Sequence, residues 1–190
     1  MPWGADSSDE DLMLCYRDGD AGAFDALYAR HKGGLYRYLL RQCREPGAAE
    51  ELFQDVWMNL IRSRAGYTVQ AKFTTYLYRL AHNRLIDHYR KHGQAVVTSL
   101  DAEDGPVVED LVDESRQPPD TAYDLKRQAV ELLRLVAELP APQREAFLLQ
   151  QEGGMSVEAI AAATGVSRET AKSRLRYALA KLRQGMSKWH

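Results

Sequence analysis

The chain has 190 residues, of which 45% are hydrophobic and 27% are charged, and its formal net charge is −2. This composition supports a folded core and excludes a globally disordered chain, and the sequence has no apolar run of about 18 residues that would cross a membrane. The acidic N-terminus lacks the apolar segment of a secretory signal, so we expect the protein to remain in the cytoplasm.

Helical periodicity dominates the first part of the chain. Asp20 is well placed to cap a helix that runs to about residue 43. Gly33 and Gly34 interrupt this helix and indicate a kink or a close helix contact, because glycine costs about 1 kcal/mol relative to alanine inside a helix. After Pro46-Gly47, residues 48–63 predict a second helix.

A loop over residues 65–72 precedes a further predicted helix over 73–91, with Leu77, Leu80, Ala81 and Leu85 on its inner face. The aromatic residues of this region stand among basic residues, a combination that suits unstacked bases, since stacking contributes about 1–3 kcal/mol per base. Some of these rings must belong to the core instead, and Phe73 and Tyr78 are the candidates.

Charge is distributed very unevenly. Residues 62–92 hold seven basic and one acidic side chain, a net of +6, and residues 156–190 hold seven basic and two acidic, a net of +5. Between them, residues 93–124 hold nine acidic side chains and one basic, a net of −8. Two basic blocks on either side of an acidic, proline-containing linker suggest two surfaces for a polyanion, although ordinary solvated helix faces would give the same counts.

The second part of the chain is also helical. A helix beginning near residue 121 is expected to bury a stripe of Val130, Leu133 and Val136, and Pro142 is suited to the start of the next helix. No segment requires a β-strand, so the predicted fold is all-α, with about four helices on each side of the linker.

Residues 156–183 predict a helix-turn-helix. Ser156 and Ser167 are good N-caps, Gly165 suits the left-handed end of the first helix, and Val166 would fill the turn. The exposed side of the second helix would offer donors to base edges and phosphates. Its candidate DNA-binding residues are Arg168, Thr170, Lys172, Ser173, Arg176 and Tyr177. The alternative is a helical hairpin whose basic face only makes the protein soluble.

Two blocks of sequence carry sets of motifs. Residues 9–92 contain Ala49-Glu50-Glu51-Leu52, Gln54-Asp55-Val56-Trp57 and Tyr76-Leu77-Tyr78-Arg79-Leu80-Ala81. Residues 121–186 contain Leu139-Pro140, Gln143-Arg144-Glu145, Gly165-Val166-Ser167 and Lys172-Ser173-Arg174-Leu175. With these motifs, the first block resembles region 2 and the second resembles region 4 of extracytoplasmic-function (ECF) sigma factors of the sigma-70 family. Residues 93–120 would be the acidic linker between the two domains.

The resemblance implies that the protein is a transcription initiation factor. Its implied partners are promoter DNA and core RNA polymerase, which it would bind at the clamp helices and the flap of the polymerase. Region 4 would engage the −35 element through the recognition helix. The residues implied in binding the clamp helices are Glu51, Gln54, Asp55 and Trp57. Those implied in binding and opening the −10 element are Lys72, Tyr76, Arg79, Asn83, Arg84, Asp87, Arg90 and Lys91. The family also implies an anti-sigma partner, with apolar surface near residues 52–60 as a candidate contact.

The chain offers no catalytic constellation, and we expect no enzymatic activity, cofactor or metal. Cys15 and Cys43 match no pairing motif and are expected to be free thiols, while His82, His88 and His92 lack cysteine partners for zinc. Two other readings stay open: a stand-alone helix-turn-helix regulator, which would bind an operator without polymerase, and a helical adaptor with no role on DNA.

Overall fold

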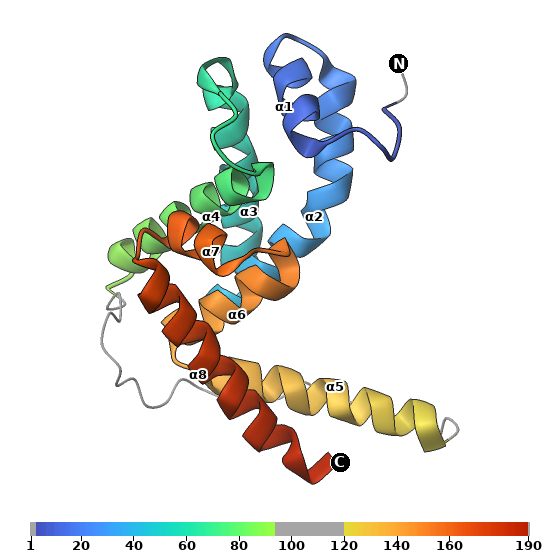
Figure 1. Ribbon diagram of the computed structural model, residues 1–190, viewed down its shortest axis with the longest axis vertical. Helices are drawn as coiled ribbons and strands as arrows, with labels where there is room; N and C mark the ends of the chain where they lie inside the picture. Colours follow the sequence, from blue (N-terminus) through green and yellow to red (C-terminus); the bar gives the residue numbers. More distant parts are fainter. Residues whose placement is uncertain (1–2, 94–119, 190) are drawn as a thin grey trace.

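The computed structural model describes residues 3–93 and 120–189, and within these ranges it contains helices and no strand, which confirms the all-α class. The acidic linker predicted for residues 93–120 falls almost entirely outside the described residues. The helices are α1 (Asp9–Arg17), α2 (Ala21–Cys43), α3 (Pro46–Ser63), α4 (Phe73–Lys91), α5 (Asp120–Glu138), α6 (Ala141–Gly153), α7 (Val157–Thr164) and α8 (Arg168–Met186), with 3-10 turns at Arg64–Gly66 and Ser187–Trp189 (Figure 1). None of the helices in the described ranges is both long and apolar enough to cross a membrane.

Helices α1 to α4 form the N-terminal half. The carboxylate of Asp20 caps α2 as predicted, because its Oδ1 accepts hydrogen bonds from the backbone N–H groups of Gly22 and Ala23 at 2.9 and 3.3 Å. Phe73 and Tyr78 are both buried, which confirms their assignment to the core. Cys15 and Cys43 are free thiols.

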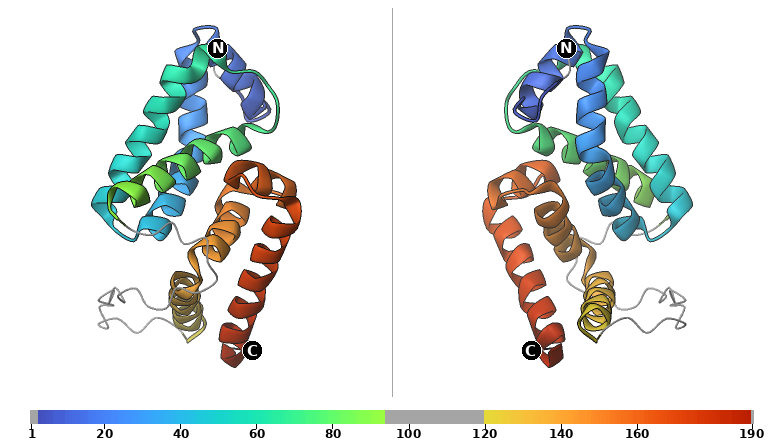
Figure 2. Two further views of the ribbon diagram at one scale, coloured as in Figure 1. Left: turned by 90° about the vertical axis from the view of Figure 1, so that its left-hand side faces the viewer. Right: turned by 90° about the vertical axis from the view of Figure 1, so that its right-hand side faces the viewer.

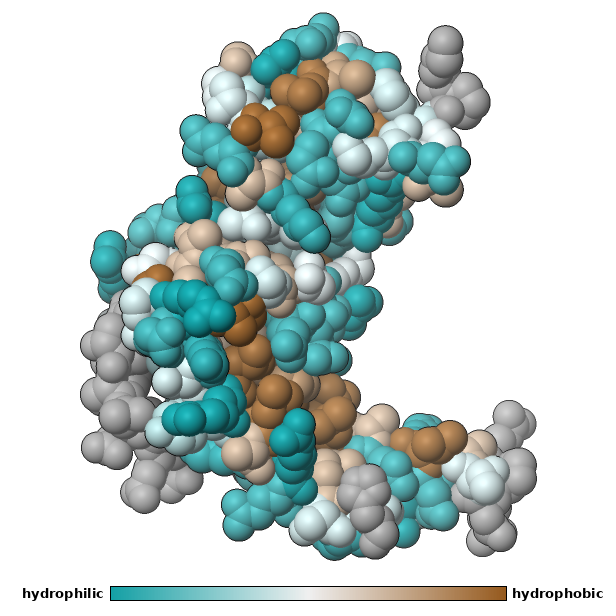
Figure 3. Space-filling view, viewed as in Figure 1, coloured by the Kyte–Doolittle hydropathy of each residue, from teal (hydrophilic) through white to brown (hydrophobic). Residues whose placement is uncertain are grey.

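Helices α5 to α8 form the C-terminal half, where one sequence prediction is wrong. Of the stripe predicted on α5, Val136 is buried, but Val130 and Leu133 are 47% and 42% exposed. Helix α8 instead approaches α5 at Leu135, so closely that a Cβ on Gly185 would lie 2.6 Å from that leucine's methyl groups. Apolar surface therefore gathers along α5 and its junction with α8 (Figure 3).

The two halves pack against each other. Helices α2 and α4 of the N-terminal half contact α6 and α7 of the C-terminal half, while α5 and α8 extend away from this junction (Figure 2). Helix α4 therefore lies directly beside the first helix of the predicted helix-turn-helix.

Candidate nucleic-acid interface

In the helix-turn-helix, a serine caps the start of each helix and a glycine ends the first helix. The hydroxyl of Ser156 accepts from the N–H of Ala159 at 3.1 Å, and the hydroxyl of Ser167 accepts from the N–H of Thr170 at 3.1 Å. Gly165 has a φ of +69°, and its N–H donates to the carbonyl of Ala161 at 2.9 Å. Because an L-residue is strained at that φ, glycine allows the tight turn that sets α8 against α7.

Helix α8 presents most of its predicted DNA-binding residues to solvent, since Ala171, Leu175, Ala178 and Leu182 form its buried side. Ser173 is half-buried, and the exposed members are Arg168, Thr170, Lys172, Arg176 and Tyr177. The hydroxyl of Thr170 accepts from that of Ser167 at 2.9 Å and so belongs to the cap. The guanidinium of Arg176 lies 5.1 Å from the centre of the Tyr177 ring.

The basic side chains on this face differ in whether they already form an ion pair with an acidic side chain. Arg168 Nε donates to Glu158 Oε1 at 2.7 Å, and this bond raises the pKa of Arg168 and lowers that of Glu158. Lys172 and Arg176 form no ion pair with an acidic side chain in the described part of the chain. These two side chains can therefore meet phosphates or bases without first breaking an ion pair.

Helix α4 divides its residues between core and solvent as the sequence predicted. Phe73, Leu77, Ala81 and Leu85 are buried, and Leu80 is half-buried. The exposed candidates for −10 binding are Lys72, Arg79, Asn83, Asp87, Arg90 and Lys91. Tyr76 is half-buried, and its hydroxyl lies 2.7 Å from that of Ser63.

The candidates for polymerase binding all lie on helix α3, but they differ in exposure to solvent. Glu51 and Gln54 are exposed. Asp55 accepts from Arg84 of α4 at 2.6 Å, so a predicted polymerase contact and a predicted DNA contact are joined in one ion pair. Trp57 is only 4% exposed and packs in a cluster of rings with Phe24, Tyr28 and Phe53.

The apolar surface expected near residues 52–60 is mostly core. Leu52, Val56 and Leu60 are at most 2% exposed, and Met58 is the member of this stretch that reaches solvent, at 43%. These side chains face the neighbouring helices because α3 packs against both α2 and α4 in the N-terminal half. They therefore do not form the partner surface that the sequence suggested.

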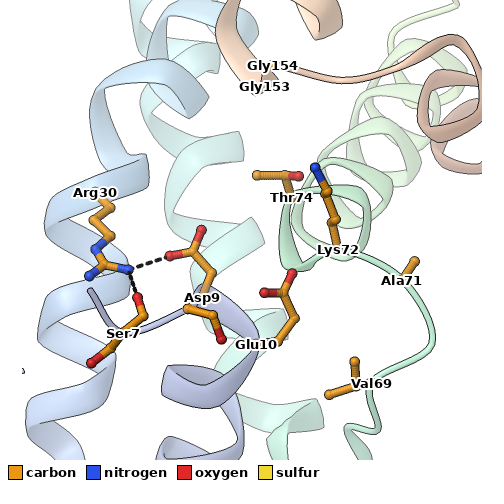
Figure 4. A pocket seen from close by; sticks show the side chains of 11 residues that line it. Ser7, Asp9, Glu10, Arg30, Val69, Ala71, Lys72, Thr74, Gly153 and Gly154 are labelled. Atoms are coloured by element: carbon orange, nitrogen blue, oxygen red, sulfur yellow. Dashed lines mark hydrogen bonds and ion pairs between the residues drawn. The ribbon is translucent and has the colours of Figure 1, made fainter. Parts of the chain in front are cut away.

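A groove of about 650 Å³ lies at the start of α4. Lys72, Thr74 and residues of the preceding loop form one wall, the start of α1 forms another, and Gly153-Gly154 of the C-terminal half closes the rim (Figure 4). The carboxylate of Glu10 accepts from the N–H of Phe73 at 2.6 Å and holds the first turn of α4 in place.

Sequence reasoning missed a set of polar residues at the junction of the halves. Their side chains are polar but lie at inward positions of otherwise amphipathic helices. This mismatch was the feature of the sequence that could have indicated a polar contact there. The members are Tyr38, Gln42, His82, Tyr89, Arg144 and Glu145.

Comparison with known proteins identifies both halves. Residues 27–95 match the model of Sigma-70 region 2, and residues 129–182 match that of Sigma-70, region 4. The chain is 32% identical to RNA polymerase sigma factor CarQ of Myxococcus xanthus over 174 residues, which cover 90% of this chain and 94% of CarQ. It is also 32% identical to ECF RNA polymerase sigma factor RpoE of Cereibacter sphaeroides over 180 residues, 93% of each chain.

Two solved structures share the fold. CnrH, in complex with the cytosolic domain of CnrY, superposes with a TM-score of 0.66 at 21% identity over 96% of this chain and 99% of CnrH. The sigma factor RpoE of Bartonella quintana, in complex with the anti-sigma factor NepR, gives a TM-score of 0.62 at 21% identity over 86% of this chain and 96% of RpoE.

Proposed function

The chain belongs to the ECF group of the sigma-70 family of RNA polymerase sigma factors, and on that premise we propose how its two halves share the work of promoter recognition. As an ECF sigma factor, it acts with core RNA polymerase and promoter DNA in the initiation of transcription. We assign residues 9–92 to core polymerase and the −10 element, residues 121–186 to the −35 element, and residues 93–120 to the linker between them.

The capped helix-turn-helix with its exposed basic face is the observation that carries the proposal. Helix α8 would enter the major groove with its first turns, where Lys172 and Arg176 meet base edges or phosphates. Arg168 would first exchange its bond to Glu158 for one to DNA. Thr170, Ser173 and Tyr177 complete the proposed −35 surface.

Helix α4 would engage the −10 element through its exposed cations and Asn83. Lys72, Arg79, Arg90 and Lys91 supply charge for the phosphates, and Tyr76 supplies a ring for an unstacked base. The ion pairs of Arg84 with Asp55 and Asp87, at 2.6 and 3.6 Å, would orient this surface relative to α3.

For polymerase binding, Glu51 and Gln54 would contact the clamp helices directly. Trp57 would act from inside the core, by fixing the side of α3 on which Gln54 stands. No catalytic step is assigned to the chain, because the polymerase performs the chemistry, and the place of action is the cytoplasm.

An anti-sigma factor is a proposed partner. A sigma factor of the same fold has been solved in complex with the anti-sigma factor NepR, and CnrH, which shares the fold, has been solved in complex with the cytosolic domain of CnrY. In this chain the exposed apolar residues Leu125, Val130 and Leu133 of α5 are the candidate contact, in place of residues 52–60. Affinity purification of the protein from its cells tests this, and recovery without a stoichiometric inhibitor would count against it.

Run-off transcription on a promoter library, with core RNA polymerase and with or without this protein, tests the function. We expect initiation at a subset of promoters that requires both proteins, and a loss of it when Lys172 and Arg176 are both changed to alanine. Arg134→Ala is the control, because Arg134 pairs with Glu131 and Glu138 on α5, away from α8's basic face. Tight operator binding without polymerase would favour a stand-alone regulator, and unchanged activity in the double variant would favour an adaptor.

A further inference from the structure

A buried carboxylate joins the two halves of the molecule. Glu145 of α6 is 8% exposed, and its Oε1 accepts a hydrogen bond from the hydroxyl of Tyr38 on α2 at 2.7 Å. The same oxygen lies 2.6 Å from Nδ1 of His82 on α4, which must donate, because a carboxylate can only accept. One side chain of the C-terminal half is thus bound by two helices of the N-terminal half.

Arg144, the neighbour of Glu145, makes a second connection. Its Nε donates to Oε1 of Gln42 at 2.9 Å, while its Nη1 donates to the carbonyl of Leu139 at 3.1 Å. The hydroxyl of Tyr89 donates to the carbonyl of Gln42 at 3.0 Å. The bond of Arg144 to Gln42 crosses the junction, whereas the bond of Tyr89 lies on its N-terminal side. We call this junction the seam: Tyr38, Gln42, His82 and Tyr89 of the N-terminal half with Arg144 and Glu145 of the C-terminal half.

Backbone packing at the seam depends on a glycine. A Cβ on Gly34 would lie 3.0 Å from the carbonyl oxygen of Glu152 and 3.1 Å from the hydroxyl of Tyr78. A Cβ on the adjacent Gly33 would meet only the end of the flexible Arg37 side chain, at 3.2 Å. Of the two outcomes that the glycine pair indicated, the close helix contact is confirmed, and it lies between the halves.

This closed arrangement cannot read both promoter elements at once. The −10 and −35 elements are separated by about 25 base pairs, or roughly 85 Å of duplex at about 3.4 Å per base pair. Helix α4 lies directly against α7, and α8 follows α7 after a tight turn. Arg79, a proposed −10 contact, already donates to the carbonyl of Ala162 at the end of α7, at 3.2 Å.

We propose that the seam is an autoinhibitory latch, which keeps the free protein closed until core RNA polymerase captures the open form. This inference rests on the proposed function. When only the open form binds, the apparent dissociation constant for the polymerase equals the intrinsic one divided by the open fraction. A change that weakens the seam alone therefore strengthens binding, whereas a change that damages the fold weakens it.

The test uses conservative variants in matched pairs, in the full-length chain. Tyr38→Phe removes one hydroxyl from Glu145, and its control Tyr67→Phe removes a buried hydroxyl that has no hydrogen-bond partner among the described residues. Gly34→Ala places a methyl group in the seam, and Gly33→Ala places one beside it on the same helix. Circular dichroism establishes that each variant is folded.

The measured quantity is the dissociation constant for core RNA polymerase. We expect Tyr38→Phe to tighten binding about tenfold, the typical loss for one hydrogen bond to a charged group, and Gly34→Ala to tighten it severalfold. Both controls should stay within about twofold of the unmodified protein. Unchanged or weaker binding in both seam variants would overturn the proposal.

A distance measurement separates this proposal from the proposed function. Spin labels on cysteines introduced at the exposed positions of Glu50 and Arg183, with Cys15 and Cys43 replaced by serine, report on the two halves. A single narrow distance in the free protein is expected, and a broad distribution of longer distances would overturn the latch. A closed protein that binds no core polymerase in any variant would refute the proposed function instead.

Discussion

Lys172 shows what a single side chain of the recognition helix can be expected to do. It is exposed and has no acidic partner in the described ranges, so its charge is available to a phosphate. Lys172→Ala should weaken binding of the holoenzyme to all promoters alike, and should lower the slope of log affinity against log salt concentration by about 0.9, as for one lost phosphate contact. Titrations between low and moderate salt measure that slope. Lost preference for particular bases with an unchanged slope would contradict a phosphate contact.

Asp9 gives a prediction on pH dependence. Its carboxylate accepts from Arg30 at 2.9 Å and lies 2.7 Å from Nε2 of His31, and the bond to His31 is the main cause that lowers the pKa of Asp9 below 3.8. A lowered carboxyl pKa stabilises the folded state above pH 3.8, and this contribution is lost as the pH falls through the folded-state pKa.

Asp9→Asn should therefore lower the free energy of unfolding at pH 7 and pH 5, with a difference from the unmodified protein that shrinks below pH 3.8. Urea unfolding at each pH measures it. Asp25→Asn is the control, because Asp25 is exposed and forms no ion pair within residues 3–93 or 120–189. A difference that is constant down to pH 3 would show that the pairing of Asp9 does not contribute.

At the scale of single residues, the sequence predicted the helix caps correctly. Asp20, Ser156, Ser167 and Gly165 cap their helices as expected, because a cap depends on neighbours within three or four residues. Trp57 shows the limit: the sequence predicted that it contacts the polymerase, but its burial depends on rings from α2.

At the scale of elements, the turn between α7 and α8 carries a prediction. Gly165→Ala forces an L-residue to a φ of +69° and should lower the free energy of unfolding by about 1–2 kcal/mol. Gly66→Ala is the matched change, because that glycine has no positive φ and no atom within 4 Å of an added Cβ. Urea unfolding compares the two, and equal effects would mean that the turn tolerates an L-residue.

Helix α5 explains why the ranges of the helices were easier to predict than their buried faces. Periodicity predicted a helix near residue 121 and a stripe of Val130, Leu133 and Val136. The buried side is set instead by α8, whose Gly185 lies against Leu135. That contact joins residues 50 positions apart, so no local pattern contains it.

At the scale of the whole molecule, the connections between the halves should differ greatly in strength. Arg37 pairs with Glu152 at 2.9 Å, but its side chain is 52% exposed, so Arg37→Ala should cost at most about 1 kcal/mol of unfolding free energy. Glu145→Ala leaves the buried hydroxyl of Tyr38 without its acceptor, at about 1–3 kcal/mol, and also removes the acceptor of Nδ1 of the half-buried His82. Urea unfolding of the full chain measures both, and similar losses would mean that the seam does not stabilise the molecule.

The arrangement of the halves was the part of the fold that the sequence did not yield. Gly34 indicated a close contact but not its partner, and Tyr38, His82 and Glu145 carry no pattern that pairs them. Each is a polar residue at an inward position of its own helix. Such a position is explained only by the hydrogen-bond partner that the other half supplies. The candidate DNA-binding faces were predictable because they follow from periodicity within one helix.

The tryptophans are divided between the two halves, with Trp3 and Trp57 in the first and Trp189 in the second. Trp57 is enclosed by Phe24, Tyr28 and Phe53, whereas Trp189 is half-buried and has the guanidinium of Arg127 5.4 Å from its ring centre. Trp57 therefore emits from an apolar setting, whereas Trp189 emits from beside a charged side chain. Trp189→Phe would leave an emission spectrum that reports on the first half alone, and the difference from the spectrum of the unmodified protein would report on Trp189 in the second half.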